Sequence, residues 1–145
     1  MDLLSLLNEN ARLTNAQLAV MLGKTEEEVE KEIADYQQKG IIKGYKALIN
    51  WEKVDHHKTT ALIELKVQPK KESGFDEIAK KIMQFSKVES VYLMSGGFDL
   101  AVMVHGDSIQ DIAMFVAKRL SPLDSVLSTA THFILTRYKE GDVIL

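Results

Sequence analysis

The sequence predicts an α+β protein in which three helices precede an alternating series of strands and helices. Through the first forty residues, apolar side chains recur at spacings of three and four, which is the period of an amphipathic helix. From Thr59 onward, apolar side chains alternate with polar ones, which is the period of a strand. This change of period predicts two modules of different architecture.

The first two helices are predicted from leucine spacing and from a capping pair. Residues 2–9 contain four leucines at helical spacing, which predicts a first helix. Thr14 and Gln17 have the form of a capping box, in which the hydroxyl and the amide satisfy free backbone groups where a helix starts. A second helix is therefore expected over residues 15–22.

The third helix is predicted to follow after a very short turn. Gly23 tolerates left-handed backbone angles and is expected to end the second helix. Thr25 with Glu28 gives a second capping pair, and the next helix is expected over residues 26–39 with Gly40 at its end. Two helices joined in this way predict a helix-turn-helix.

The segment that follows predicts how the chain divides. Residues 41–50 are rich in β-forming side chains around a glycine and predict a short hairpin or wing. The polar residues 51–58 are expected to be a linker. The predicted domains are therefore a winged helix-turn-helix over residues 1–50, which is the candidate DNA-binding module, and a second domain over residues 59–145.

The second domain is predicted to have the order β-α-β-β-α-β. The expected elements are a strand from Thr59 to Val67, a helix from Phe75 to Met83, strands over 88–94 and 98–104, a helix after Ser108, and a strand from Val126 to Tyr138. This order is that of a ferredoxin-like sheet with both helices on one face. The tail, residues 139–145, is expected to add a short strand.

Composition excludes several classes of function. The chain has no cysteine, which excludes disulfides, thiolate metal sites and cysteine nucleophiles. His56 and His57 are adjacent and point in different directions in an extended chain, so neither a metal site nor a cofactor is expected. No stretch approaches the roughly 20 apolar residues of a membrane span, and a cytoplasmic protein without a membrane partner is expected. The net charge of −3 argues against a protein that coats nucleic acid.

Residues 15–50, NAQLAVMLGKTEEEVEKEIADYQQKGIIKGYKALIN, resemble the DNA-binding part of the leucine-responsive regulator (Lrp/AsnC) family. The SGGFDL turn and the TATHFIL run near the end also resemble this family, and the pieces stand in the family's order along essentially the full length. The resemblance implies a transcription regulator that binds double-stranded DNA and responds to a small effector, an amino acid or a related molecule. It also implies a homodimer formed through the sheet, often assembled into higher oligomers.

The third helix would enter the major groove of DNA if the resemblance holds. Residues 26–39 carry six acids against two lysines, which is the wrong sign for contact with phosphates. Family members commonly carry arginine about where Glu32 stands. The candidate DNA contacts are the remaining donors on this helix and its flanks: Arg12, Lys24, Thr25, Lys31, Gln37, Gln38, Lys39, Lys43 and Lys46.

The turn between the two central strands is the candidate effector site. Its glycines let backbone amides approach a carboxylate, and Asp99 can neutralise an ammonium group. The resemblance implies an effector beside this turn at a subunit interface, with hydroxyls from the last strand. The candidate residues are Ser95, Gly96, Gly97, Phe98 and Asp99, with Ser128, Thr129 and Thr131. The alternative is a plain hairpin turn with strand hydroxyls in water.

Two further functions compete with the ligand-responsive regulator. The first is a sensing or assembly protein whose helix-turn-helix docks a protein or a related subunit and does not read DNA, which the acidic third helix favours. The second is a tetrapyrrole decarboxylase-like subunit, since such subunits resemble the same family; His105 or His132 would then serve a porphyrin-like substrate. The sequence contains no catalytic constellation, so an enzyme is not expected.

Overall fold

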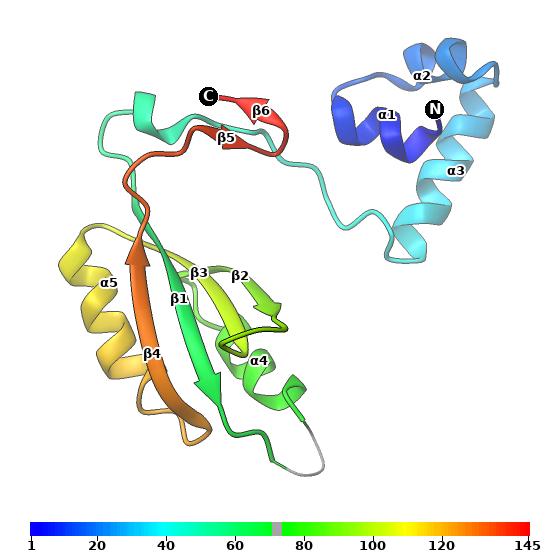
Figure 1. Cartoon of the computed structure of the whole chain (residues 1–145). Coiled ribbons are helices and arrows are strands. Elements are labelled where there is room, and N and C mark those ends of the chain that lie inside the picture. The colour runs from blue at the N-terminus through cyan, green and yellow to red at the C-terminus, as the bar shows by residue number, and fades with distance from the viewer. Residues whose placement is uncertain (71–73) are drawn as a thin grey trace. The chain divides into compact units, whose positions relative to one another are not determined.

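The chain folds into two compact units, Met1–Leu48 and Ile49–Leu145, in a computed structural model that describes residues 1–70 and 74–145. The first unit is helical, and the second combines a sheet with helices (Figure 1). The predicted α+β class is confirmed. Among the described residues, no helix has the length and apolar character needed to cross a membrane.

The first unit contains three helices within about one residue of the predicted bounds. They are α1 (Leu3–Glu9), α2 (Asn15–Leu22) and α3 (Glu26–Gln38). The apolar stripes of the three helices meet in one small core of buried residues: Leu3, Leu6, Leu7, Leu18, Ala19 and Val29. The unit is held by few side chains, because each helix is short.

The ends of these helices form as their sequence predicts. The Oγ of Thr14 accepts from the backbone N–H of Gln17 at 3.1 Å, and the Gln17 amide oxygen accepts from the Thr14 N–H at 2.9 Å, which completes the capping box. Gly23 has a φ of +66° and ends α2, and the next N–H, that of Lys24, donates to the Ala19 carbonyl at 3.0 Å. At α3, Thr25 caps through its hydroxyl.

The predicted hairpin or wing over residues 41–50 is wrong: all ten residues are described, and none lies in a strand. The first β-forming residues of this segment instead close α3, because the N–H groups of Ile41 and Ile42 both donate to the Tyr36 carbonyl, at 2.9 and 3.1 Å. Ile42 also packs on the helical core. A two-stranded hairpin is marginal without further strands, and the rest of the segment is extended without a ladder.

The second unit confirms the β-α-β-β-α-β order. Its elements are β1 (Thr59–Val67), α4 (Asp76–Met83), β2 (Val88–Leu93), β3 (Leu100–Gly106), α5 (Ile109–Phe115), which continues as a π-helical turn (Val116–Leu120), and β4 (Val126–Phe133). The strands form one antiparallel sheet in the order β2-β3-β1-β4. This is the ferredoxin-like arrangement, with β1 and β3 in the centre.

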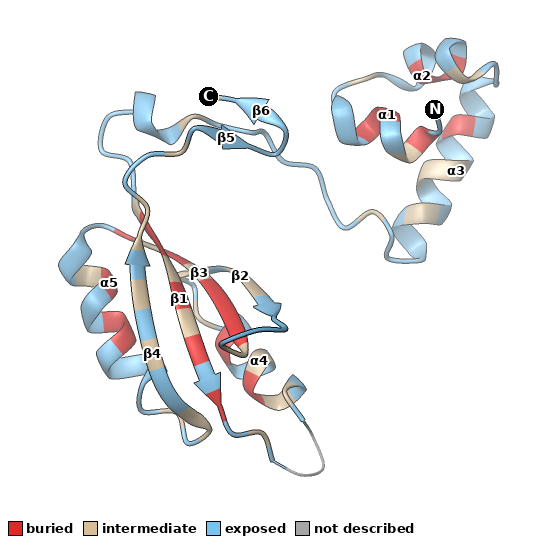
Figure 2. Cartoon of the chain, viewed as in Figure 1, coloured by how far each residue is buried: buried red, intermediate tan, exposed pale blue. Residues whose placement is uncertain are grey.

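Both helices pack on one face of the sheet, as predicted. Side chains alternate along β1, so that Ile63 and Leu65 are fully buried, and Val102 of β3 lies beside them in the register. Ile82 of α4 and Ile112 of α5 belong to the same buried cluster. Figure 2 shows the buried residues of this unit concentrated on these central strands and on parts of the two helices.

The last predicted strand is too long. β4 ends at Phe133 and not at Tyr138, because β1 begins at Thr59 and offers no partner for the residues beyond Ile134. The tail forms a separate two-stranded hairpin, β5 (Lys139–Glu140) with β6 (Val143–Ile144). The expected linker, residues 51–58, falls within the second unit, where Trp51–Lys53 form a 3-10 turn, η1.

A compact polar cluster at the start of α5 was not foreseen from the sequence. The Asp111 carboxylate accepts from the Lys87 ammonium and from the Asp107 N–H, the latter at 3.0 Å. Gly106 lies so close that a Cβ there would stand 2.6 Å from Asp111 Oδ2. The Ser108 hydroxyl accepts from the Asp111 N–H at 3.0 Å, so the serine-x-x-aspartate spacing is the signal that would have indicated this cap.

Candidate nucleic-acid interface and effector site

The candidate DNA-reading surface is formed by α3 and the turn before it. The closure at Gly23 and the cap at Thr25 fix where α3 begins. Val29 is fully buried and anchors the helix, which leaves the remaining faces of α3 toward solvent. The Thr25 hydroxyl accepts from Glu28 and still has its own O–H to donate.

A network of polar side chains across the turn engages Lys24, one of the candidate DNA contacts, and Glu32 of α3. The Lys24 ammonium lies 2.7 Å from one oxygen of Glu32, and the other oxygen of this carboxylate accepts from the Tyr36 hydroxyl at 3.2 Å. The hydrogen bond to Glu32 raises the pKa of Lys24 above its ordinary value, which favours the charged ammonium. Glu32 therefore ties the turn before α3 to the helix itself, through its ion pair with Lys24.

Two more of the predicted lysines are paired along α3 itself. Lys31 lies 3.4 Å from Glu27, and Lys39 lies 2.7 Å from Asp35, each one helical turn apart. Such exposed pairs contribute about 0–1 kcal/mol each, so a phosphate can replace the acid at small cost. The acidity of α3 is thus partly balanced within the helix, and its lysines are not free cations.

The cations without such pairing flank α3. Within residues 1–70 and 74–145, the side chains of Arg12, Lys43 and Lys46 have no ion-pair partner. Gln37 and Gln38 are exposed at the end of the helix. The structure therefore divides the predicted contacts into paired lysines on α3 and unpaired donors before α2 and after α3.

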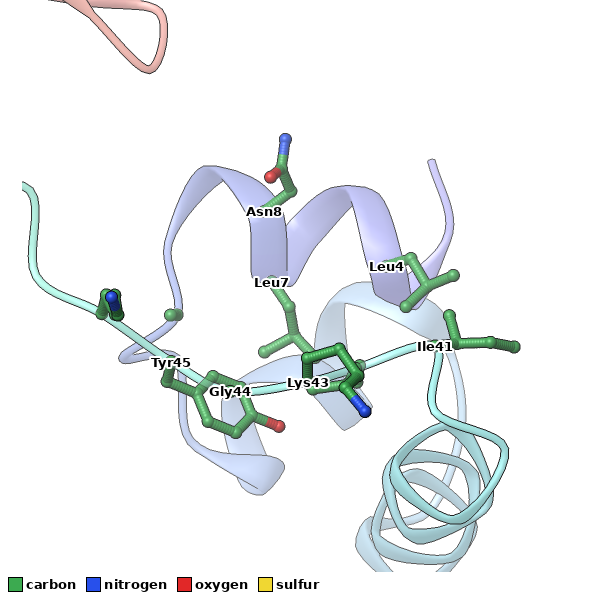
Figure 3. A pocket seen from close by; sticks show the side chains of 10 residues that line it. Leu4, Leu7, Asn8, Ile41, Lys43, Gly44 and Tyr45 are labelled. Atoms are coloured by element: carbon green, nitrogen blue, oxygen red, sulfur yellow. The ribbon is translucent and has the colours of Figure 1, made fainter. Parts of the chain in front are cut away.

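The extended segment after α3 lies beside α1 and encloses a cavity of about 490 Å³ with it. Leu4 and Leu7 point from α1 toward the segment, and Lys43 and Tyr45 project from it, whereas Asn8 points away (Figure 3). Lys43 and Lys46 both line this cavity. The segment thus holds these two cations near the helical core although it forms no strand.

At the candidate effector turn, Asp99 is already engaged by the backbone. Its carboxylate accepts from the Val67 N–H at 2.9 Å, and its own N–H donates to the Leu65 carbonyl at 2.9 Å. The pairing of β1 with β4 shifts register between Lys66 and Val67, so the strand ladder is interrupted beside this N–H. Asp99 therefore has a structural role in closing the turn, besides any role toward an ammonium group.

The remaining effector candidates share one end of the sheet but not one face. Leu65 pairs with Leu100, just after the turn, and with Thr129 on its other side. Thr129 and Thr131 are half-buried and share the helix-covered face, whereas Ser128 is exposed on the other face. Because β1 separates β3 from β4, the turn and these hydroxyls lie roughly 10 Å apart, two strand spacings.

The sheet face opposite the helices carries uncovered apolar side chains. Leu62 pairs with Met103 and with His132 across the three strands β3, β1 and β4. Tyr92 of the edge strand β2 is 55% exposed, and Glu64 lies 3.5 Å from the His132 ring. Partly exposed apolar side chains on the open face of a sheet are typical of a contact surface.

Comparisons of the sequence and of the fold with known proteins both find transcription regulators. Residues 60–144 match the family described as the Lrp/AsnC ligand binding domain. The HTH-type transcriptional regulator YugG of Bacillus subtilis is 48% identical over 139 residues, which cover 95% of this chain and 84% of that protein.

Solved structures with lower identity share the fold. A transcriptional regulator of Neisseria meningitidis, solved as an L-Met complex, is 22% identical with a TM-score of 0.73, covering 93% of this chain and 86% of its own. The feast or famine regulatory protein of Mycobacterium tuberculosis, complexed with L-methionine, is 23% identical with a TM-score of 0.75, covering 94% and 90%.

Proposed function

Because the chain belongs to the Lrp/AsnC family of transcription regulators, we propose that its helical unit binds double-stranded DNA and that its second unit binds an amino acid. The observation that carries the DNA half is the helix-turn-helix closed at Gly23 and capped at Thr25. We propose a binding protein and not an enzyme, in keeping with relatives that are named as transcriptional regulators.

DNA contact in this proposal comes mainly from the flanks of α3. Arg12, Lys43 and Lys46 meet phosphates directly, since no carboxylate competes for them within the described residues. Thr25 donates its hydroxyl at the start of α3, and Gln37 and Gln38 supply amide groups at its end. The logarithm of the DNA-binding constant falls with the logarithm of the salt concentration, by about 0.9 for each phosphate that the protein neutralises. Because few cations of the described helical unit are unpaired, we expect this slope to be small.

The amino-acid effector binds beside the Ser95–Asp99 turn. The backbone groups of this turn meet the carboxylate, and the Asp99 oxygen not bonded to Val67 is available to the ammonium. A single small molecule does not span the roughly 10 Å from this turn to Thr129, so the hydroxyls of β4 come from a second copy of the chain. Two relatives solved with L-methionine make this amino acid the first one to try.

The homodimer in this proposal forms through the uncovered sheet face. Leu62, Met103 and Tyr92 supply its apolar centre, and covering them is the simplest way to remove that surface from water. Glu64 and His132 lie on the same face and become partly desolvated in the dimer. The effector site is then completed where two such dimers meet.

A gel-shift selection on genomic fragments, with and without L-methionine, tests the proposal. We expect selected fragments to bind more tightly than random DNA, and L-methionine to change that affinity. Lys43→Gln should weaken binding about three- to tenfold, whereas Lys31→Gln, which removes an already paired lysine, should change it less. No preference over random DNA at low salt would contradict the proposal.

Charge reversal on α3 is best made at Glu30 and not at Glu32. Glu30 is exposed, whereas Glu32 bridges Lys24 and Tyr36, so Glu32→Arg would also dismantle the turn. Glu30→Arg should strengthen general DNA affinity if α3 faces phosphate.

The paired lysines of α3 favour a second candidate function, in which the helix-turn-helix docks another protein. An α3 surface whose cations are held by its own acids presents carboxylates such as Glu26 and Glu30 to a basic partner. Unchanged DNA affinity in both Glu30→Arg and Lys43→Gln would favour this function over DNA reading.

A further inference from the structure

A second cavity, of about 380 Å³, lies in the second unit at the end of the sheet away from the effector turn. Thr60, at the start of β1, pairs with His105, at the end of β3, and both line this cavity. The turn joins β3 at Leu100, five residues from His105, so the two places are separated by roughly 17 Å of strand. The cavity is therefore distinct from the proposed effector site.

The cavity is built from segments that are tied together. Residues 51–58 form one wall, and the Glu52 carboxylate accepts from the Arg137 N–H at 3.2 Å, which joins this wall to the segment after β4. The Lys58 ammonium lies 2.7 Å from Asp107, which joins it to the loop after β3. Figure 1 shows these segments gathered at the end of the sheet where β1 begins. The wall is thus fixed at both ends.

The segment that forms the wall, residues 51–58, has a strained backbone at one position beside the cavity. His56 has a φ of +58°, a left-handed conformation that is unusual for a residue other than glycine. His57, next to it, is within 3.2 Å of the Val54 carbonyl through Nδ1, and all three residues line the cavity. Strained residues cluster at binding sites because the surrounding structure holds them there.

Two polar groups at the cavity lack a hydrogen-bond partner within the part of the chain that the structure describes. His105 Nδ1 is buried without a hydrogen bond among the described residues, and the Glu89 carboxylate, 3.1 Å away, lies outside hydrogen-bonding geometry. Within residues 1–70 and 74–145, the Arg137 guanidinium has no ion-pair partner either, while Lys58 is engaged by Asp107. The main group in the cavity that is available to bind a ligand is therefore the guanidinium of Arg137, a half-buried residue.

We propose that this cavity binds a small aromatic carboxylate. The carboxylate pairs with the Arg137 guanidinium, whose fork of N–H donors matches it in geometry. The ring lies against the indole of Trp51, which lines the cavity and is 45% exposed. The volume suits a molecule of one or two rings. An ammonium ligand is disfavoured, because Arg137 lacks an ion-pair partner among the described residues, whereas Glu89, the acid of the described lining, lies 3.1 Å from the His105 ring.

The chain carries its own reporter of this site, since Trp51 is its only tryptophan. Titration of the full chain with benzoate or phenylacetate should change the tryptophan emission in a saturable way, whereas the neutral benzamide should not. Arg137→Gln should weaken benzoate binding at least about tenfold, the usual loss when a charged hydrogen-bond partner is removed. The matched control is Arg119→Gln, an exposed arginine outside the cavity, which should leave binding unchanged.

A second variant guards against simple misfolding. Glu89→Gln removes the one negative charge of the lining and should tighten benzoate binding severalfold, a gain that a damaged fold does not produce. Equal binding to Arg137→Gln and Arg119→Gln would overturn the proposal, as would the absence of any saturable change. Emission that depends on protein concentration but not on benzoate would also overturn it, because a second copy of the chain would then fill the cavity.

Discussion

The two units of this chain are stabilised in different ways. Among its described residues, the second unit has a core of thirteen buried apolar side chains, contributed by β1, β3, α4, α5 and the π-helical turn. The first unit has six, contributed by three short helices, and relies on caps and on surface ion pairs such as Lys24–Glu32 to hold its turn. A core so small leaves the helical unit with little reserve, because the fraction of surface that folding buries falls with size.

This difference bears on function. The sheet of the second unit has unused surface, namely one uncovered face and a cavity, because its stability comes from the other face. In the helical unit the same side chains serve both folding and the candidate interface: Glu32 fixes the turn, and Lys24 is its partner. Substitutions at the DNA-reading surface are therefore expected to affect the folding of the helical unit, whereas substitutions on the open sheet face are expected to affect dimer formation and not the fold of a single copy.

The largest expected effect is the loss of stability when a buried leucine is removed from the smaller of the two cores. Leu18 is fully buried in α2, and Leu18→Ala should remove about 2–5 kcal/mol, the usual result of truncating a buried leucine. Domains are stabilised by roughly 0.05–0.15 kcal/mol per residue, so this loss approaches the whole stability of a unit of 48 residues. Hydrogen exchange measured by NMR should show the helices unprotected and the sheet still protected.

Val20→Ala on the same helix is the control for that prediction, because Val20 is 83% exposed and its truncation should change little. Ile82→Ala makes the corresponding cavity in the second unit and should lower stability without loss of the sheet. If the amides of the helices were equally protected from exchange in Leu18→Ala and in Val20→Ala, the contrast between the two units would be wrong.

The next largest effect concerns the close approach at Gly106. A methyl group there would stand 2.6 Å from Asp111 Oδ2 and 2.9 Å from Ile112 Cγ1, so Gly106→Ala should destabilise the second unit by about 1–3 kcal/mol. Gly97→Ala is the matched control, because nothing lies within 4 Å of the corresponding position. Chemical denaturation followed by circular dichroism measures the stability of both variants. Equal midpoints would show that α5 can move to make room for the added methyl group.

The parts of this fold that could be predicted from the sequence are those fixed by local interactions. The Thr14–Gln17 capping box, the turn at Gly23 and the helical and strand periods all depend on residues within a few positions of one another. The failed wing at 41–50 and the overlong β4 depend instead on whether a partner strand is present, which a local pattern of β-forming residues does not specify.

The candidate sites follow the same division. The Ser95–Asp99 turn lies between two strands, as the sequence predicts, but the hydrogen bond from the Val67 N–H to Asp99 depends on a register shift in another strand. Likewise, the pairing of Lys24 with Glu32 spans the turn, and the cavity near Trp51 joins segments more than eighty positions apart in the chain. Such contacts are set by tertiary packing, so only a three-dimensional structure identifies them.

The smallest expected effect is the pH dependence that Asp111 gives to the stability of the second unit. The Lys87 ammonium, followed by the Asp107 N–H, holds the pKa of Asp111 below its ordinary value of 3.8. A carboxylate whose pKa is lowered by folding contributes stability that is fully present above pH 3.8 and is lost as the pH falls through the lowered pKa. Asp111→Asn keeps the shape and an oxygen acceptor but removes the charge.

Thermal unfolding of wild type and Asp111→Asn should therefore differ above about pH 4 and converge at lower pH. Lys87→Gln should reproduce the same convergence, because it removes the other member of the pair. Asp124→Asn, at an exposed position, is the control and should follow wild type throughout. If the difference in unfolding temperature between wild type and Asp111→Asn stayed the same in acid, Asp111 would act through its hydrogen bonds alone. The second unit would then differ more clearly from the helical unit, whose turn is held by the Lys24–Glu32 ion pair.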